Sequence, residues 1–212
     1  DTIEKTGEMY NVIPLVNRGQ AFVQLGKYNM SLDDFTKAIS VDPNYSDAFY
    51  YRCMAKIDMN MYPEDVIDLS KAIQSNPGDI AAIIARGLAR MKIQDIKGAF
   101  SDLNNAIVHE TKNPEVFAAR GYLYVISDDF NRALADYNQA IKLNPNNQFY
   151  YKFRGISEVM IGRYHEAIND FNLVLQTMQD PSVYYFRGFA KNKLGYLDEG
   201  CSDIKLAKDF GY

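Results

Sequence analysis

Residues 114–147 read PEVFAARGYLYVISDDFNRALADYNQAIKLNPNN, and this stretch decides the fold. It contains two runs in which apolar side chains recur every three or four residues, separated by a polar turn at Asp128. Such spacing places the apolar groups on one face of a helix. Pro145 follows the second run, where a proline can end a helix. The stretch therefore predicts a hairpin of two amphipathic helices.

The same pattern recurs along the chain with a period of 34 residues. Counting in steps of 34 from Arg18 leads to residues 52, 86, 120 and 154, and a last step of 33 leads to Arg187. Each of these arginines precedes a glycine, except Arg52, which precedes Cys53. An aspartate stands sixteen residues after every one of the six arginines. So many coincidences do not arise by chance, and the sequence therefore predicts six helical hairpins.

At these positions the sequence resembles the tetratricopeptide repeat family, whose 34-residue pattern has a large residue, then Leu-Gly, Tyr, Ala, Phe, Ala and Pro. Arginine replaces the usual leucine, and the resemblance is weakest in the second repeat, where Cys53 and Asp65 stand at small-residue positions. The resemblance covers residues 12–212 and implies an all-α fold, a right-handed α-solenoid of six helix-turn-helix repeats. In residues 114–147 the other family positions hold Phe117, Gly121, Tyr124, Ala133, Tyr137, Ala140 and Pro145.

The repeat register also predicts the organisation of the chain. We expect residues 1–11 to form an N-terminal extension, and all six repeats to belong to one solenoid domain. The chain does not begin with Met, and its last residues, DFGY, lack a polar capping helix, so we expect a fragment or a mature form. The expected repeats are residues 12–45, 46–79, 80–113, 114–147, 148–180 and 181–212.

A single hairpin cannot bury its apolar faces, so neighbouring hairpins are expected to stack around a continuous core. The small residue after each arginine lets two backbones approach closely. The arginine and aspartate columns are flanked by core positions, which favours structural ion pairs over a repeated catalytic or binding device. The predicted pairs are Arg18–Asp34, Arg52–Asp68, Arg86–Asp102, Arg120–Asp136, Arg154–Asp170 and Arg187–Asp203.

Composition and motif content argue against several functional classes. The net charge is -4 and the basic residues are scattered, which disfavours nucleic acid as a partner. No apolar run approaches the roughly 18 residues that cross a bilayer, so we expect no direct membrane insertion and a soluble chain, cytoplasmic or periplasmic. His109 and His165 have no cysteine near them in the register, and phosphate-loop, GxSxG and HExxH motifs are absent. We therefore expect no metal, no cofactor and no enzymatic activity.

The family resemblance implies that the first helices of successive repeats line a concave groove. Lys, Asn and Arg form a clamp there in family members that capture chaperone tails, and the corresponding positions here lack it, which disfavours that role. The implied groove is apolar and aromatic, which suits an amphipathic or extended peptide segment. Its residues are Tyr50, Tyr51, Met54, Ile84, Leu88, Tyr122, Phe149, Lys152, Phe153, Ile156, Tyr185 and Phe189.

Two functions remain open at this point. The leading prediction is a non-enzymatic protein–protein interaction scaffold or adaptor whose groove binds a peptide or a helical segment. The alternative is a self-associating structural or assembly protein, a homo-oligomer that uses the same surface.

Overall fold

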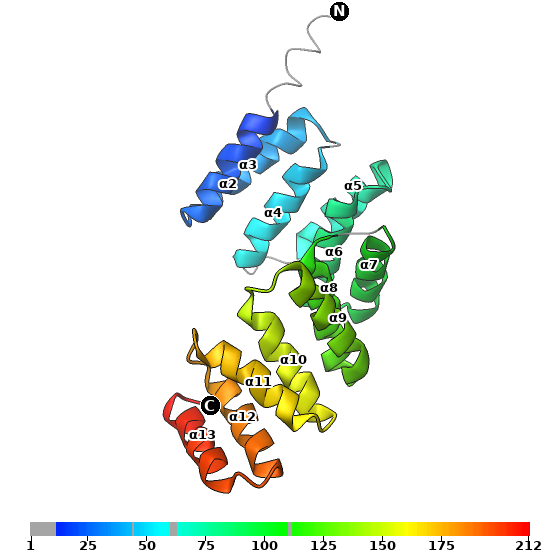
Figure 1. The fold of residues 1–212 in the computed structure, drawn as a ribbon. Coiled ribbons are helices and arrows are strands. Elements are labelled where there is room, and N and C mark those ends of the chain that lie inside the picture. The colour runs from blue at the N-terminus through cyan, green and yellow to red at the C-terminus, as the bar shows by residue number, and fades with distance from the viewer. Residues whose placement is uncertain (1–11, 44, 60–62, 110–111) are drawn as a thin grey trace, which may run out of the picture. The chain divides into compact units, whose positions relative to one another are not determined.

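A computed structural model describes residues 12–43, 45–59, 63–109 and 112–212. Within these ranges every regular element is a helix, as Figure 1 shows, which confirms the predicted all-α class. The helices are α2 (Val12–Gln24), α3 (Tyr28–Val41), α4 (Ser46–Asp58), α5 (Pro63–Ser75), α6 (Ile80–Lys92), α7 (Ile96–Val108), α8 (Pro114–Ile126), α9 (Phe130–Leu143), α10 (Gln148–Met160), α11 (Tyr164–Leu175), α12 (Pro181–Lys193) and α13 (Leu197–Asp209).

The helices pair into antiparallel hairpins, and each hairpin lies inside one predicted repeat. The chain divides between residues 111 and 112 into two compact units. In the first unit, α4 packs on α2 and α3, and α6 packs on α4 and α5. In the second unit, α10 packs on α8 and α9, and α12 packs on α10 and α11. Each unit is therefore a short solenoid of stacked hairpins, and the exact repeat boundaries and the right-handed sense stay predictions.

Side-chain caps fix where many of these helices begin. The capping oxygen accepts hydrogen bonds from backbone N–H groups of the first turn, which otherwise lack partners. Pro114 and Pro181 stand in the first turn of α8 and α12, where a missing N–H costs nothing. The capping residues are Asp79, Asp95, Asn113, Asp129, Asn147 and Asp180.

The core of each unit is shared between neighbouring hairpins. Ile39 of α3 packs against the cluster around Phe35 and also against the cluster around Leu69 and Phe49 of the next hairpin. In the second unit, Tyr137 of α9 and Tyr150 of α10 are buried in one cluster. Apolar surface of one hairpin is therefore hidden by the next, as the repeat pattern predicts.

Every hairpin whose turn lies within the described residues has a residue with positive φ in that turn. Gly26, Gly162 and Gly195 adopt φ values of 69°, 80° and 88°, and the equivalent Gln94 and Asp128 adopt 61° and 58°. Only glycine occupies this left-handed region without steric cost. Gln94 and Asp128 are therefore mildly strained.

We expect Gln94→Gly to raise the free energy of unfolding by about 0.5 kcal/mol, because relief of the strained φ exceeds the extra entropy of glycine in the unfolded chain. Urea unfolding followed by circular dichroism measures the change. Gly162→Ala is the matched control and should lower stability, since the same position then acquires a side chain. A loss of stability in Gln94→Gly would contradict the assignment.

Candidate interaction surface

The arginine and aspartate columns meet as two-point ion pairs. In the fifth repeat, Arg154 Nε lies 2.7 Å from Asp170 Oδ2, and Arg154 Nη2 lies 2.7 Å from Asp170 Oδ1. This parallel geometry is the strong form of an arginine–carboxylate contact. Asp68 lies outside the described side chains, so the pair predicted for the second repeat is not described. The same geometry joins Arg18–Asp34, Arg86–Asp102, Arg120–Asp136 and Arg187–Asp203.

The remaining guanidinium nitrogen of the repeat arginine, Nη1, contacts the preceding repeat. Among the hydrogen bonds that the structure describes, Nη1 of four of these arginines donates to a side-chain oxygen on the second helix of the preceding hairpin. Arg86, Arg154 and Arg187 thus each tie three helices together, two of their own repeat and one of the neighbour. The donor–acceptor pairs are Arg52–Thr36 (3.4 Å), Arg86–Ser70 (3.2 Å), Arg154–Asn138 (2.7 Å) and Arg187–Asn172 (2.8 Å).

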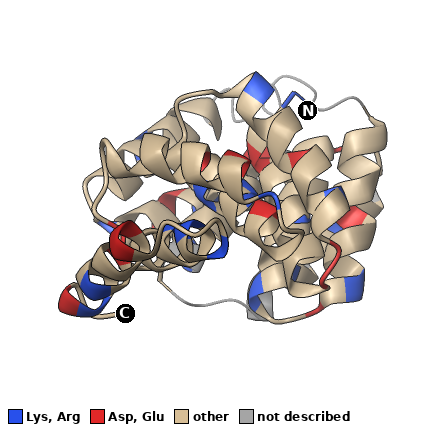
Figure 2. Ribbon diagram, turned by 60° about the horizontal axis from the view of Figure 1, so that its bottom comes forward, with Lys and Arg blue, Asp and Glu red and all other residues tan. Residues whose placement is uncertain are grey.

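Along the described helices, charged residues of both signs are mixed. Figure 2 shows the lysines and arginines interspersed with the aspartates and glutamates along the helices. Within the part of the chain that the structure describes, no group of three His, Cys, Asp or Glu side chains could hold a metal ion. The arginines and aspartates of the two-point pairs bind one another, so these charges serve packing and hydrogen bonding within the protein.

The predicted groove residues of the first unit are largely engaged in packing. Tyr51 stacks on Phe35 with ring centroids 6.2 Å apart, and Tyr50 meets Tyr51 edge-on at 5.1 Å. Ile84 is only 5% exposed, so it presents almost no free surface. Met54 and Leu88 are half-buried.

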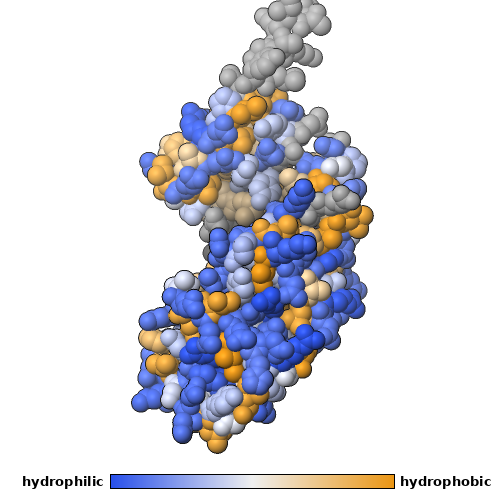
Figure 3. Space-filling view, viewed as in Figure 1, coloured by the Kyte–Doolittle hydropathy of each residue, from blue (hydrophilic) through white to orange (hydrophobic). Residues whose placement is uncertain are grey.

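In the second unit, two predicted groove residues are well exposed. Tyr122 of α8 is 41% exposed and Phe149 of α10 is 54% exposed. Phe153 lies between the core and the surface, because it stacks on Tyr137 at 6.1 Å and meets the edge of Tyr122 at 5.8 Å. The view in Figure 3 shows apolar residues in separate patches among polar ones. The remaining predicted residues of this unit, Ile156, Tyr185 and Phe189, are half-buried.

Lys152, the one cation among the predicted groove residues, is already paired. Its Nζ lies 2.5 Å from Oδ2 of Asp180, the N-cap of α12, and 5.9 Å from the ring centroid of Phe153. Burial opposes ionisation of Asp180, but hydrogen bonds from Lys152 and Ser182 outweigh it and lower the pKa of Asp180. Lys152 therefore joins α10 to the start of α12, and its charge is neutralised within the protein.

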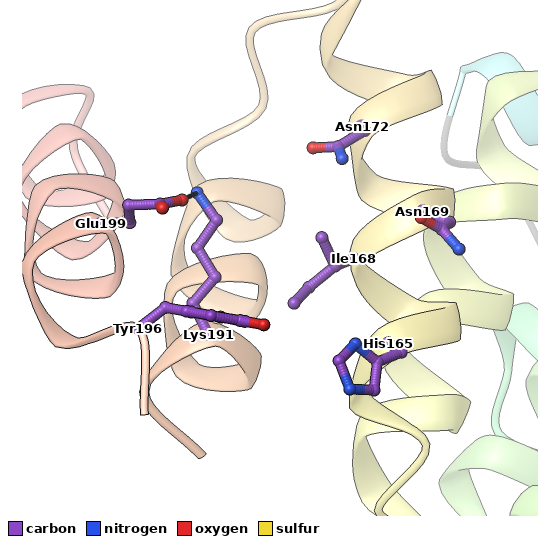
Figure 4. Close-up of a pocket in the computed structure, with 7 residues that line it drawn as sticks. All are labelled: His165, Ile168, Asn169, Asn172, Lys191, Tyr196 and Glu199. Atoms are coloured by element: carbon purple, nitrogen blue, oxygen red, sulfur yellow. Dashed lines mark ion pairs between the residues drawn. The ribbon is translucent and has the colours of Figure 1, made fainter. Parts of the chain in front are cut away.

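A polar pocket of about 300 Å³ lies apart from the predicted groove residues, between α11 and the hairpin of α12 and α13. Figure 4 shows Asn169 and Asn172 on α11, and Lys191 and Glu199 joined by an ion pair of 3.2 Å. Lys191 also lies 3.0 Å from Asp203, and Asn172 accepts from Arg187. Within this lining, Lys191 and Glu199 are therefore engaged in ion pairs inside the sixth repeat, and Asn172 is engaged in the hydrogen bond to Arg187 that joins the fifth repeat to the sixth.

Comparison with known proteins agrees with this geometry. Sequence profiles of the tetratricopeptide repeat match residues 13–45 and 114–147. The chain is a tetratricopeptide repeat protein. None of the curated protein sequences matches it significantly. The repeat resemblance seen in the sequence is thus confirmed.

Solved structures share the fold of this tetratricopeptide repeat protein at low sequence identity. PilF of Pseudomonas aeruginosa superposes with a TM-score of 0.84 at 17% identity, covering 97% of this chain and 94% of that one. A tetratricopeptide repeat protein from Parabacteroides merdae gives 0.67 at 19%, covering 92% and 77%. YrrB, described as having an unusual peptide-binding site, gives 0.71 at 18%, covering 84% and 92%. At these identities the likeness establishes the fold alone.

Several contacts between repeats in this tetratricopeptide repeat protein were not foreseen from the sequence. One is the hydrogen bond from the Tyr150 hydroxyl to the Glu115 carboxylate, which joins α10 to α8. Burial first, and then this bond, raise the pKa of Tyr150. The residues that accept a hydrogen bond from arginine Nη1 could have been predicted from the sequence. The residue eighteen places after each of the first five repeat arginines carries a side-chain oxygen.

None of the helices in the described part of the chain combines the length and the apolarity that crossing a bilayer demands.

Proposed function

We propose that this protein is a non-enzymatic scaffold that binds an apolar peptide or helical segment of another protein on the first helices of its repeats. Tetratricopeptide repeat proteins generally mediate protein–protein interactions. The observation that carries the proposal is the pair of exposed aromatic side chains, Tyr122 and Phe149, on successive first helices α8 and α10. Rigid aromatic rings that are exposed in the free protein are common anchors of an interface.

The chemistry of this surface favours an apolar partner segment. Lys152 is neutralised by Asp180, so it does not supply a free cation for a partner carboxylate. Tyr122 packs edge-on against Phe153, and this contact orients the Tyr122 ring before a partner arrives. Because little side-chain entropy is then lost on binding, such a ring contributes more affinity than a mobile one. The solved structure of YrrB, whose description names a peptide-binding site, supports the same use of the fold.

We expect Tyr122→Ala combined with Phe149→Ala to weaken peptide binding at least tenfold. Removal of aromatic side chains that a partner buries at the centre of an interface costs about 2 kcal/mol or more of binding free energy. The probe is a peptide selected from a phage-displayed library of amphipathic helices on the full chain, with affinity measured by calorimetry. These two residues are preferred to Phe153, which also stacks on the buried Tyr137. The circular-dichroism spectrum should stay helical.

Tyr196→Ala is the matched control, because Tyr196 is similarly exposed but lies at the turn between α12 and α13. Its affinity should equal that of the wild type. Equal affinity of the Tyr122 and Phe149 double variant would contradict the proposal. Self-association through the same face would instead show as a mass that rises with concentration in light scattering and falls in the double variant.

A further inference from the structure

Glu158 of α10 occupies a position where three other repeats place a cation. Four residues after the repeat arginine stand Lys56 in the second repeat, Arg90 in the third and Lys191 in the sixth. Arg90 Nη1 lies 2.7 Å from Asp102 Oδ2, and Lys191 Nζ lies 3.0 Å from Asp203 Oδ2. This position therefore adjoins the buried aspartate of the repeat. In the fifth repeat it holds a carboxyl group instead.

The surroundings of Glu158 penalise its negative charge. Glu158 is 8% exposed, and its Oε2 has no hydrogen-bond partner among the described residues. Burial is the largest influence, followed by repulsion from Asp170 and, more weakly, Glu166 of α11, while Arg154 and Arg163 attract. In the described part of the chain, α8, α9 and α12 add no charged group to this environment. Together these influences raise the pKa of Glu158 to about 7.

We propose that Glu158 makes the hairpin of α10 and α11 a proton-sensitive element, tightly packed while Glu158 is protonated and weakened when Glu158 ionises beside Asp170. Arg154 cannot neutralise both groups fully, because its Nε and Nη2 already bind Asp170 and its Nη1 binds Asn138. The charge on Glu158 thus adds a second anion to a buried site where the more strongly attracting guanidinium, that of Arg154, is already bound to Asp170.

The sign of the effect follows from proton binding. The ordinary pKa near 4.5 applies in the unfolded chain, and the value of about 7 applies in the folded chain. Between these values the folded state holds a proton that the unfolded state has lost. Stability therefore falls as the pH rises through this window and levels off above it. This is the reverse of the usual carboxylate, whose pKa is lowered by folding.

A consequence for binding follows, and it rests on the proposed function. The helix that carries Glu158 also carries Phe149 and Phe153 of the proposed binding surface. Ionisation of Glu158 would loosen the helix that presents these rings, so peptide binding should weaken above neutral pH. The proton sensitivity itself does not depend on any partner, and a stability experiment therefore tests it separately.

The experiment compares the full-length wild type with Glu158→Gln and Glu158→Lys by thermal unfolding at pH 5 and pH 8. We expect the melting temperature of Glu158→Gln to exceed that of the wild type by about 5 °C more at pH 8 than at pH 5. Glu158→Lys introduces the cation that the second, third and sixth repeats carry at this position. Its melting temperature should likewise exceed that of the wild type by more at pH 8 than at pH 5. Hydrogen exchange of the α10 and α11 amides should accelerate from pH 5 to pH 8, beyond the intrinsic rate, in the wild type and not in Glu158→Gln.

Glu166→Gln is the matched control, since Glu166 is exposed on the same hairpin and exerts the weaker repulsion. The difference in melting temperature between Glu166→Gln and the wild type should change little between pH 5 and pH 8. If the melting temperatures of Glu158→Gln and the wild type differed by the same amount at pH 5 and pH 8, the proposal would be overturned. If neither variant folds, a carbon-13 titration of Glu158 in the wild type decides, because a midpoint near pH 7 supports the proposal and one near pH 4.5 refutes it.

Discussion

Replacing Arg154 by alanine is expected to lower the free energy of unfolding by about 3 kcal/mol or more, because it leaves a buried carboxylate without its partner. Asp170 is 4% exposed and accepts two hydrogen bonds from Arg154. The loss of stability should exceed that from breaking an ion pair alone, because the substitution also removes the hydrogen bond from Arg154 to Asn138 of the preceding hairpin. Urea unfolding measures the total, and hydrogen exchange locates the weakened helices at α9, α10 and α11.

Arg18→Ala is the matched control within the same chain. Arg18 makes the same two bonds to Asp34, but its side chain is 57% exposed against 22% for Arg154. Water screens and replaces an exposed contact, so the loss should be clearly smaller. Equal losses at the two positions would show that burial and the tie to the preceding repeat do not set the energy. Arg154→Lys should recover only part of the loss, because an ammonium group cannot bind both carboxylate oxygens in parallel.

Gly188→Ala is expected to lower the free energy of unfolding by about 2–3 kcal/mol through steric overlap between α12 and α13. A Cβ at this position would lie 2.7 Å from the backbone oxygen of Gly200 and 2.9 Å from Ile204. A backbone atom cannot swing aside as a flexible side chain can, so the two helices must separate. Thermal or urea unfolding measures the loss.

Gly87→Ala tests whether the loss comes from the close approach or from the glycine column as such. Its nearest neighbours, Asp102 and Leu103, would lie 3.2 Å from the new Cβ and are side-chain atoms. Alanine favours a helix interior over glycine by about 1 kcal/mol, which should offset the mild crowding. Stability should therefore change little, and a loss as large as that of Gly188→Ala would count against the steric argument.

The two sets of variants address different contacts that hold the helices together. Arg154 joins the two helices of its own hairpin through Asp170 and the preceding hairpin through Asn138, whereas Gly188 lets the two helices of one hairpin approach closely. Because stability in a stacked array is shared between neighbours, damage at one repeat is expected to spread to the adjacent one.

The sequence alone determined the repeat, the paired helices and the aspartate partners of Arg18, Arg86, Arg120, Arg154 and Arg187. A fixed period of 34 residues puts equivalent residues in equivalent surroundings, so one hairpin pattern read from residues 114–147 serves for the others. The positions of the turns also followed from the repeat period. Gln94 shows, however, that a turn position with positive φ is not always occupied by glycine.

Only the tertiary structure decided which side chains remain accessible and which charges are satisfied. Ile84 is buried and Lys152 is paired with Asp180, whereas Tyr122 and Phe149 stay exposed, although the same register had placed all four in one groove. Exposure and ionisation depend on the side chains that adjacent hairpins bring within a few ångströms of each position. A periodic pattern specifies that a neighbour is present, but the particular atoms of that neighbour differ from repeat to repeat.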